Sequence, residues 1–254
     1  MYIFPADKVD LVDRSGDFAA LALVGPGACA VLEAAAVLEG VPGNGEVVEL
    51  ARGFGYALAG VGLDVPGVTL LVRRDAEVDM LRALGSMPGV VTINAAESDL
   101  LRLLSGRPRA GPDLTDVNPL EAGLWGCVSF EKGCYIGQET MAKLNRVGGP
   151  KKQLWGLRTS SSVLALPLPV PLYAELDDAR SVGSLTSCVL TAEGDVVGLG
   201  YVRTQSGGDG TRLYTSDGTA IEVVGVPFPR RSREQCADAV GILPSTATQL
   251  VEEG

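Results

Sequence analysis

The segment SFEKGCYIGQET, residues 129–140, combines residue types that can support thiol chemistry. Its cysteine, Cys134, follows Lys132 by two positions and precedes the stretch GQETMAKLNR, for which the sequence predicts a helix. A cysteine acts as a nucleophile or metal ligand through its thiolate, which a neighbouring ammonium group and the N-terminus of a helix both favour. The pattern therefore indicates an exposed, functional Cys134 with Lys132 as its cationic neighbour. It is equally compatible with a strand–turn–helix joint whose cysteine is partly buried.

The residues around Cys134 are expected to form a tight turn. Gly133 and Gly137 are predicted to allow backbone conformations that other residues resist, with Gly137 at the entry to the helix. Gln138 and Glu139 fall in the first helical turn, where amide and carboxylate groups satisfy free backbone N–H groups or reach a ligand. We therefore expect the turn to present Cys134 to solvent.

The other cysteines lack such surroundings. The chain has five cysteines and no histidine, and it contains no C-x-x-C pair. Without histidine, Ser-His-Asp and Cys-His hydrolase chemistry and zinc sites of the H-E-x-x-H type are excluded. We expect no bound metal, and the cysteine spacing fits a reducing compartment. The cysteines expected to be core or surface thiols are Cys29, Cys127, Cys188 and Cys236.

Composition limits the function classes further. The 254 residues, of which 46% are hydrophobic, are enough for one large domain or two ordinary ones. Lys and Arg number 21 against 31 Asp and Glu, and this acidic balance argues against direct binding of nucleic acid. The most apolar run, residues 163–173, contains three prolines and predicts no membrane-spanning helix. The opening MYIFPADKVD resembles neither a secretory signal nor a transit peptide, so we expect no targeting segment in this chain.

The first half of the chain alternates strand-like and helical patterns before it reaches the thiol motif. In the second predicted helix, Asp75 is placed as the N-cap, and Val78, Leu81 and Leu84 form the expected apolar face. Prolines, glycines, Asp and Asn predict an ordered loop over residues 107–123. The predicted strands are residues 18–25 and 67–74, and the predicted helices are residues 26–40, 75–87 and 97–106.

The second half is rich in short β-type runs separated by turn residues. Such a pattern predicts a small antiparallel barrel or sandwich. The glycine-rich segment SGGDG, residues 206–210, lacks the lysine of a phosphate-binding loop and is predicted to be a hairpin turn. The predicted strands are residues 153–158, 182–190, 195–203, 211–216 and 220–226.

The motif KGCYIGQE, preceded by GRP and by NPLEAGLWGCVSFE, resembles the YgfZ-type folate-binding proteins. These are relatives of the glycine-cleavage T-protein (aminomethyltransferase) that support iron–sulfur enzymes. The resemblance extends through IFPADKV, LVGPGA and LLRLLSGRP to KKQLWGLR, VGSLTS and GLGYVRT, and is closest to the plastid and cyanobacterial branch. It also implies that further residues precede IFPADKV in such proteins, so part of the folate-binding body is expected to be missing at the N-terminus.

The resemblance implies an α+β fold and a set of site residues. Residues 1–150 would form a partial T-protein-like folate-binding domain, and residues 151–254 a C-terminal antiparallel β-barrel. The implied cofactor is tetrahydrofolate or another reduced folate. The implied catalytic residues are Lys132 and Cys134, and the implied cofactor-binding residues are Arg107, Glu121, Tyr135, Gly137, Gln138 and Glu139.

The chain departs from the aminomethyltransferases at a further position. Those enzymes carry a folate-contacting glutamate in an R-x-E-A-G segment, which here is RLLSG and has Leu104 at that place. An apolar side chain cannot replace this polar anchor. The resemblance therefore implies a folate-dependent accessory protein for iron–sulfur cluster assembly or repair. The alternatives are a folate-dependent aminomethyl or one-carbon transferase and a non-catalytic scaffold.

The implied partners are iron–sulfur assembly factors or client iron–sulfur enzymes, with no direct contact to nucleic acid or membrane. Any role in tRNA modification would be indirect, through an iron–sulfur tRNA-modifying enzyme. The branch resemblance implies the chloroplast for a photosynthetic source, and a prokaryotic source would place the protein in the cytoplasm.

Overall fold

The computed structural model describes residues 8, 10–38, 40, 42–43, 45–227, 229–230, 232 and 235. The chain divides between Ile93 and Asn94 into two compact units, which are described separately. The expected domains, residues 1–150 and 151–254, stay a prediction. The division into compact units lies earlier in the chain, because helix α3, Ala95–Ser105, and the segment that follows it pack against the barrel strands. Most of the segment IFPADKV, and Cys236, lie outside the described residues.

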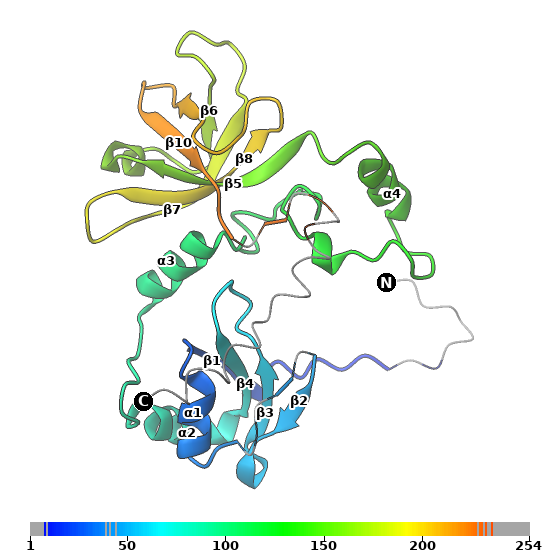
Figure 1. Cartoon of the computed structure of the whole chain (residues 1–254), viewed down its shortest axis with the longest axis vertical. Helices are drawn as coiled ribbons and strands as arrows, with labels where there is room; N and C mark the ends of the chain where they lie inside the picture. The colour runs from blue at the N-terminus through cyan, green and yellow to red at the C-terminus, as the bar shows by residue number, and fades with distance from the viewer. Residues whose placement is uncertain are drawn as a thin grey trace, which may run out of the picture. The chain divides into compact units, whose positions relative to one another are not determined.

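A four-stranded antiparallel sheet forms the first unit (Figure 1). The predicted strands at residues 18–25 and 67–74 are confirmed, and they pair along their whole length with Phe18 opposite Arg73. The sequence analysis missed the two shorter strands. The sheet has the order β1-β4-β3-β2, with β1 Phe18–Val24, β2 Val47–Glu49, β3 Gly55–Ala59 and β4 Gly67–Arg73.

Gly55 is the residue that lets β3 approach β4. It has a φ of 143°, and a Cβ atom at this position would lie 1.9 Å from the Leu71 carbonyl oxygen. No other residue type fits such a position without displacing the backbone. The close approach of β3 to β4 therefore requires glycine at this position.

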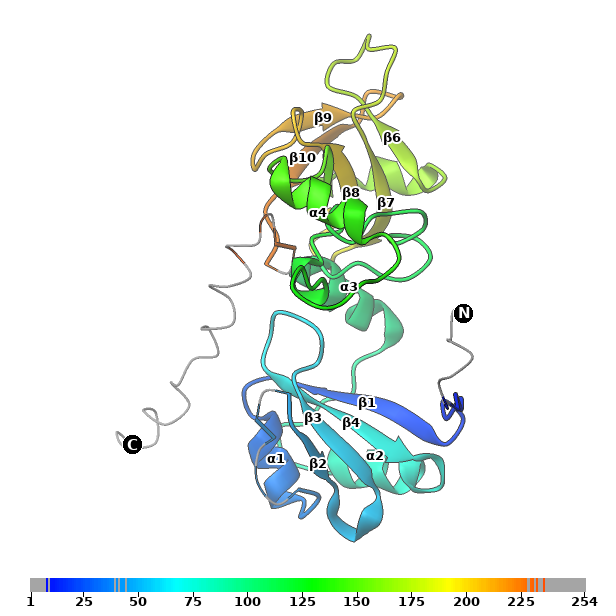
Figure 2. The ribbon, with the colours of Figure 1, turned by 90° about the vertical axis from the view of Figure 1, so that its right-hand side faces the viewer.

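Two helices pack on one face of this sheet, as Figure 2 shows. Helix α1, Ala28–Ala34, is shorter than the predicted helix, because the chain already turns at Ala36 with a φ of 54°. Val68, Leu70 and Val72 alternate along β4 and face the helices, as the period-two geometry of a strand requires. The other elements of the unit are η1 Ala51–Gly53, η2 Arg74–Ala76 and α2 Glu77–Gly85.

The predictions for the second helix were wrong at its cap and on its face. Asp75 does not cap α2, because its carboxylate accepts hydrogen bonds from the Arg73 guanidinium, while Ala76 occupies the N-cap position. Val78 and Leu81 are 65% and 49% exposed, and the buried side is formed by Met80 with Leu84. Met80 and Leu84, four positions apart, form the row that meets the sheet, and the predicted row shares only Leu84 with it.

The second unit begins with helix α3, Ala95–Ser105. Asn94 and Glu97 form a capping box at its start, and Gly106 ends it in the left-handed conformation with a φ of 79°. The predicted helix at residues 97–106 is therefore confirmed. Beyond the loop lie η3, Trp125–Cys127, and α4, Gln138–Arg146, the helix predicted after the thiol motif.

A six-stranded antiparallel barrel completes this unit. The order β6-β7-β8-β5-β10-β9 becomes a nearly closed ring through Tyr173 and Tyr214, whose backbone N–H groups each donate to the other's carbonyl, at 2.8 and 2.9 Å. The predicted α+β fold with a C-terminal antiparallel barrel is confirmed. The elements are β5 Lys152–Thr159, η4 Ser161–Ala165, β6 Val170–Leu172, β7 Gly183–Leu190, β8 Val196–Arg203, β9 Arg212–Tyr214 and β10 Ala220–Val224.

Helix α3 and the following loop cover the outside of this barrel. Leu103 of α3 and Ala122 of the loop pack on Leu154, Leu199 and Tyr201 of β5 and β8. The same strands send Leu157 and Val202 to the interior. One part of the barrel is therefore apolar on both faces, which is how α3 and its loop are anchored to it.

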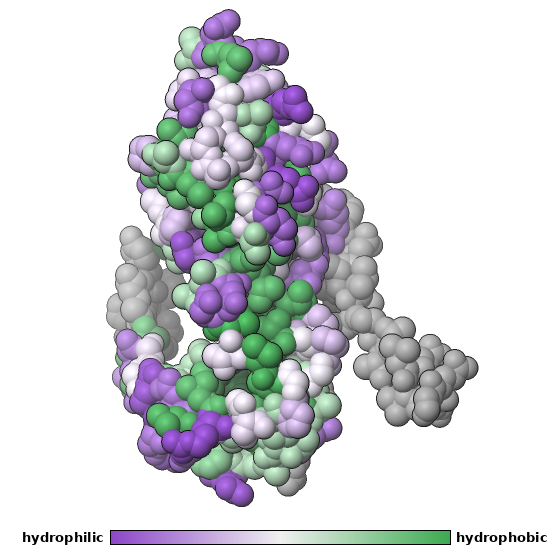
Figure 3. All heavy atoms as spheres, turned by 90° about the vertical axis from the view of Figure 1, so that its left-hand side faces the viewer, coloured by the Kyte–Doolittle hydropathy of each residue, from purple (hydrophilic) through white to green (hydrophobic). Residues whose placement is uncertain are grey.

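The segment SGGDG is not a hairpin turn. It joins β8 to β9, which are not neighbours in the sheet, and Gly210 donates its backbone N–H to the Val223 carbonyl of β10 at 2.8 Å. In the described part of the chain no helix is long and apolar enough to cross a membrane. Apolar side chains are nonetheless exposed on the surface of each unit (Figure 3).

Candidate functional site

Local hydrogen bonds hold the thiol motif in one shape. The Ser129 hydroxyl oxygen accepts from the backbone N–H groups of Glu131 and Lys132 at 3.4 and 3.2 Å. At the other end, the Gln138 side-chain oxygen accepts from the Tyr135 N–H at 3.1 Å. The turn is therefore closed on both sides of Cys134, and Cys134 itself is exposed.

The two glycines of the motif differ in role. Gly137 is the N-cap of α4 and has a φ of 88°, a conformation that glycine adopts without cost. Gly133 is not among the positive-φ glycines, and a Cβ atom there would meet nothing within 4 Å. The prediction that Gly133 supplies an unusual backbone conformation was therefore wrong, and Gly137 alone has that role in this turn.

Lys132 faces an aromatic ring. Its ammonium nitrogen lies 5.0 Å from the centroid of the Tyr135 ring, within the range of a cation–π contact. Lys132 forms no salt bridge within the described part of the chain. Its charge therefore stays available on the same exposed turn as Cys134.

A small hydrophobic cluster packs against the motif turn. Tyr135, which is half-buried, and Met141 of α4 pack with Leu120 and Trp125. The rings of Trp125 and Phe130 lie 6.3 Å apart, in a tilted arrangement. The turn is thus fixed to the segment that carries Leu120, whose neighbour is Glu121.

Glu121 is half-buried and held in place by several contacts. Its Oε2 lies 3.3 Å from Lys152 Nζ and 3.4 Å from the Asn118 backbone nitrogen, which donates to it. Its backbone carbonyl accepts from the Leu154 N–H at 2.9 Å. Its second carboxylate oxygen accepts no hydrogen bond from any described residue, which leaves it able to accept one from a ligand.

Arg107 belongs to a different group of residues, beyond the C-terminus of α3. Its carbonyl accepts from Nη1 of Arg102 at 2.7 Å. The same nitrogen donates to Oδ2 of Asp113 at 2.9 Å, and the Asp113 side chain is 0% exposed. Sequence reasoning missed this buried network, because a single aspartate in a proline- and glycine-rich loop gives no sign that it is buried.

The Asp113 carboxylate is fully engaged. Its Oδ2 also accepts from the Arg109 backbone N–H at 2.9 Å, and its Oδ1 accepts from the Thr186 hydroxyl at 2.6 Å. Its backbone carbonyl accepts from the Tyr201 hydroxyl at 2.7 Å. Burial, followed by the nearby charges of Asp113 and then Glu121, raises the pKa of Tyr201 well above its ordinary value.

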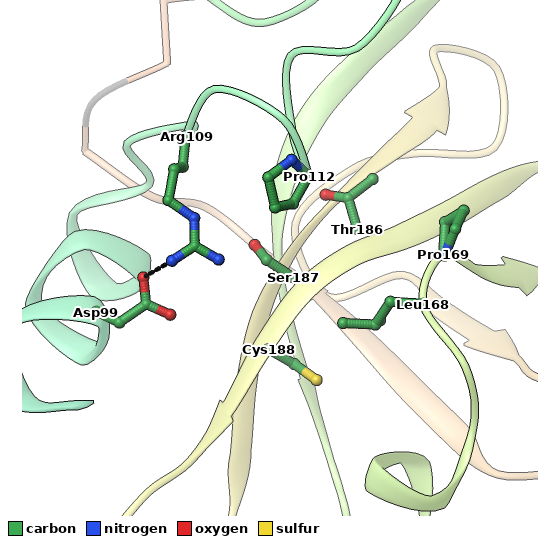
Figure 4. Close-up of a pocket in the computed structure, with 8 residues that line it drawn as sticks. All are labelled: Asp99, Arg109, Pro112, Leu168, Pro169, Thr186, Ser187 and Cys188. Carbon is green, nitrogen blue, oxygen red and sulfur yellow. Dashed lines mark hydrogen bonds and ion pairs between the residues drawn. The ribbon is translucent and has the colours of Figure 1, made fainter. Parts of the chain in front are cut away.

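Two hollows lie beside this network. The smaller, about 310 Å³, is lined by the Asp99–Arg109 ion pair and by apolar and hydroxyl side chains, with the Cys188 thiol on its wall (Figure 4). The larger is about 630 Å³ and includes Lys152 and Arg203. None of the predicted site residues lines either hollow.

The structure thus groups the predicted residues only in part. The motif residues share one turn and the start of α4, and Glu121 follows Leu120 of the cluster beneath them. Arg107 lies with the Asp113 network instead. Leu104, at the place of the aminomethyltransferase carboxylate, is 51% exposed on α3. Among the described residues, no group of three or more Cys, Asp or Glu is arranged to hold a metal ion.

Comparison with known proteins finds relatives that are named as transferases. No family model matches the chain. A chloroplastic protein of Arabidopsis thaliana that is named as a transferase is 30% identical over 250 residues, which are 94% of this chain and 55% of the relative. An aminomethyltransferase of Halothermothrix orenii is 28% identical over 242 residues, covering 87% of this chain and 64% of the relative. The chain therefore spans less than two thirds of the length of either relative.

A solved structure matches the fold. The glycine cleavage system aminomethyltransferase T from Bartonella henselae superposes with a TM-score of 0.68 at 22% identity, over 84% of this chain and 60% of that chain. The mixed sheet-and-helix architecture and the nearly closed barrel agree with this match. The chain is thus related to the aminomethyltransferase-like transferases and has the fold of the glycine-cleavage T-protein.

Proposed function

We propose that this chain is a folate-dependent accessory protein for the assembly or repair of iron–sulfur clusters, of the YgfZ type. The observation that carries the proposal is the KGCYIGQE turn, in which an exposed Cys134 lies on the same hydrogen-bonded turn as Lys132, which forms no salt bridge to a described residue. Thiolate sulfur is the ligand that iron–sulfur clusters use, normally from several cysteines. One exposed thiol on the motif turn suits contact with a cluster or a client protein rather than permanent binding.

Tetrahydrofolate is the cofactor that we assign to this function. Its reduced pterin ring presents N–H donors, and the second carboxylate oxygen of Glu121 is an acceptor of the required kind. Gln138 and Glu139, exposed at the start of α4, could reach the same ligand, while the Arg107 backbone belongs to the group of residues around Asp113. When bound, a reduced folate supplies a carrier for one-carbon groups. The role of this chain's residues is to bind and orient it.

The experiment that tests the accessory role is rescue of a strain that lacks this activity. The wild-type chain should restore an iron–sulfur enzyme activity, while Cys134→Ser and Lys132→Ala should restore much less. Cys127→Ser is the matched control, because Cys127 is also exposed but lies outside the motif. Full rescue by both motif variants would remove the roles assigned to Cys134 and Lys132.

A second candidate is a folate-dependent aminomethyl or one-carbon transferase. The relatives named aminomethyltransferases and the shared fold favour it. Leu104 weighs against it, since its apolar, exposed side chain offers no contact to a polar ligand group. Formation of methylenetetrahydrofolate from labelled formaldehyde and tetrahydrofolate, with loss of water, faster than the uncatalysed condensation, and a further gain in that rate in Leu104→Glu, would favour the transferase over the accessory role.

The partners that we propose are iron–sulfur assembly factors or client iron–sulfur enzymes, and any effect on tRNA modification would pass through such a client. The chloroplastic relative supports a plastid location if the source is photosynthetic. Reciprocal purification of the tagged wild-type chain and of Cys134→Ser would test the partners. A client recovered with equal yield by both variants would not depend on the thiol.

A further inference from the structure

The larger hollow lies on the outer face of the barrel and is lined by residues of β7 and β8, the first residue of β5 and the loop that follows α3. We call it the barrel-face pocket, and its volume is about 630 Å³, a size typical of sites for small organic ligands. Its lining includes the apolar side chains of Pro112, Val117 and Pro169. It also includes the cations Lys152 and Arg203. The pocket therefore combines apolar surface with positive charge.

The two cations of the lining, Lys152 and Arg203, are a cross-strand pair of like charges. Lys152 and Arg203 are direct register partners on β5 and β8, so both side chains leave the sheet on the same face. Like charges directly opposite one another destabilise a sheet unless a third group offsets them. Glu121 offsets only Lys152, at 3.3 Å.

Arg203 is the uncompensated member. Within the described part of the chain its guanidinium forms neither a salt bridge nor a side-chain hydrogen bond. Ser181 and Ser184 line the same pocket, and their hydroxyls make no hydrogen bond to the described residues. Guanidinium and hydroxyl donors together are the groups that bind a carboxylate or a phosphate.

The one carboxylate on the wall does not cancel this charge. Asp113 also lines the pocket, but its side chain is buried and its oxygens accept from Arg102, the Arg109 backbone and Thr186. Its charge is paired with that of Arg102, which is not part of the lining. The remaining unpaired charge of the pocket is therefore positive and belongs to Arg203.

We propose that the barrel-face pocket binds a small organic anion. Arg203, with Lys152 and the two serine hydroxyls, holds its carboxylate or phosphate group, and the apolar part of the ligand lies on Pro112 and Pro169. The smaller hollow shares Pro112, Pro169 and Thr186 with this pocket, so a longer apolar body has further surface beyond them (Figure 4). Cys134 and Lys132 lie outside the pocket.

The test is a titration of the full chain with 4-(trifluoromethyl)benzoate, followed by fluorine NMR. The neutral analogue 4-(trifluoromethyl)benzyl alcohol has the same ring without the charge, and it should bind at least about tenfold more weakly. Phenyl phosphate and phenylacetate serve as competitors. Stronger competition by phenyl phosphate identifies a phosphate ligand, and stronger competition by phenylacetate a carboxylate ligand, and either result supports the pocket.

The variants locate the binding. Arg203→Gln should weaken the benzoate about tenfold or more, with Arg203→Lys intermediate, because a hydrogen bond to a charged group is lost. Arg212→Gln is the matched control, since Arg212 is an exposed arginine at the start of β9 that does not line the pocket. Ser184→Ala, which leaves the charge in place, should weaken binding less than Arg203→Gln does.

Several outcomes would overturn the proposal. They are equal binding of the benzoate and the alcohol, unchanged binding by Arg203→Gln in a chain with wild-type circular dichroism, and an equal loss in Arg212→Gln. Absence of any change in the fluorine signal of 4-(trifluoromethyl)benzoate on addition of the chain would do the same. Rescue of iron–sulfur enzyme activity depends on the motif turn, so failure of this titration would leave that proposed function standing.

Discussion

Lys132 Nζ lies 5.0 Å from the centroid of the Tyr135 ring. The ring also packs into the cluster of Leu120, Trp125 and Met141, so it joins the exposed cation to the buried support of the turn. A cation–π contact at an exposed site contributes about 0.5–1 kcal/mol. This modest energy is enough to favour one position of a long, flexible side chain.

Two substitutions of Tyr135 distinguish the contribution of its aromatic ring from the contribution of its buried apolar area. Tyr135→Leu should lower the free energy of unfolding by about 1 kcal/mol more than Tyr135→Phe, because phenylalanine keeps both the ring under Lys132 and the buried area. Urea denaturation of the two variants and the wild type measures this difference. Equal stability of the Leu and Phe variants would show that the ring does not hold Lys132.

The thiols should react at different rates. Burial, helped by the charge of Glu33, raises the pKa of Cys29, and burial raises that of Cys188, while Cys127 and Cys134 are exposed. Iodoacetamide at neutral pH should therefore alkylate Cys29 and Cys188 at least about tenfold more slowly than Cys134, as followed by peptide mass spectrometry. Activation of Cys134 by its surroundings further requires that it react faster than Cys127.

The charge of Lys132 can be detected with reagents of different charge. Iodoacetate is an anion and iodoacetamide is neutral, so a nearby cation raises the rate ratio of the first to the second. Lys132→Gln should lower this ratio at Cys134 by about twofold or more at low ionic strength. Lys143→Gln, on α4, is the control. The same ratio in both variants would mean that Lys132 does not act on the thiol.

The two motif glycines should respond differently to substitution. Gly137→Ala should cost about 1 kcal/mol, because alanine is strained at a φ of 88°, whereas Gly137→Asn should cost less. Gly133→Ala should be tolerated, since its Cβ would meet nothing within 4 Å. Thermal unfolding of the three variants tests this order. A larger loss from Gly133→Ala would contradict the structure of the turn.

Asp113 should be the most sensitive polar position of the second unit. Asp113→Ala removes the fully buried partner of Arg102, which keeps its ion pair with Asp99 at 2.7 Å, and should destabilise by about 3 kcal/mol. Thr186→Val removes only one hydrogen bond and should cost about 1 kcal/mol. Asp177→Ala, at an exposed position, serves as the control in the same urea titrations. If Asp113→Ala lowered the free energy of unfolding by less than Thr186→Val does, the Asp113 contacts would not stabilise this unit.

Tyr201 should make stability fall at high pH. Its folded-state pKa is raised above the ordinary 10.0, so above about pH 10 the unfolded chain loses this proton while the folded chain retains it. Stability is therefore full below pH 10 and falls as the pH rises, by at most about 1.4 kcal/mol per pH unit from this group. The stability difference between the wild type and Tyr201→Phe should shrink above pH 10, and a difference independent of pH would contradict the shift.

Periodicity predicted the elements with the strongest patterns. Strands β1 and β4, helix α3 with Gly106 at its end, and helix α4 all lie where the apolar spacing indicates. Strands β2 and β6 have three residues each, too few for a period-two pattern to be visible. They exist because longer neighbours supply their hydrogen-bond partners, a tertiary effect that local sequence does not encode.

Long-range packing also explains the errors at helix α2 and in the candidate site. The row of α2 side chains that is buried is the one that packs on the sheet, where Met80 and Leu84 lie in the core with residues of β4. The burial of Asp113 depends on Arg102 and on Thr186 of β7. By contrast, the thiol turn is stabilised mainly by residues within a few positions, such as Ser129 and Gln138, and its exposure was therefore predictable.

The contact between Tyr173 and Tyr214 gives the barrel a seam. It joins the short strands β6 and β9 through a single pair of backbone hydrogen bonds, whereas β5 and β8 pair over eight residues each. Local opening follows the weakest connection, so amide hydrogens at the seam should exchange with solvent long before those of β5 and β8. The closed barrel thus protects the edges of β6 and β9 from pairing with other strands. It also has one defined place, the Tyr173–Tyr214 contact, at which the strands can separate.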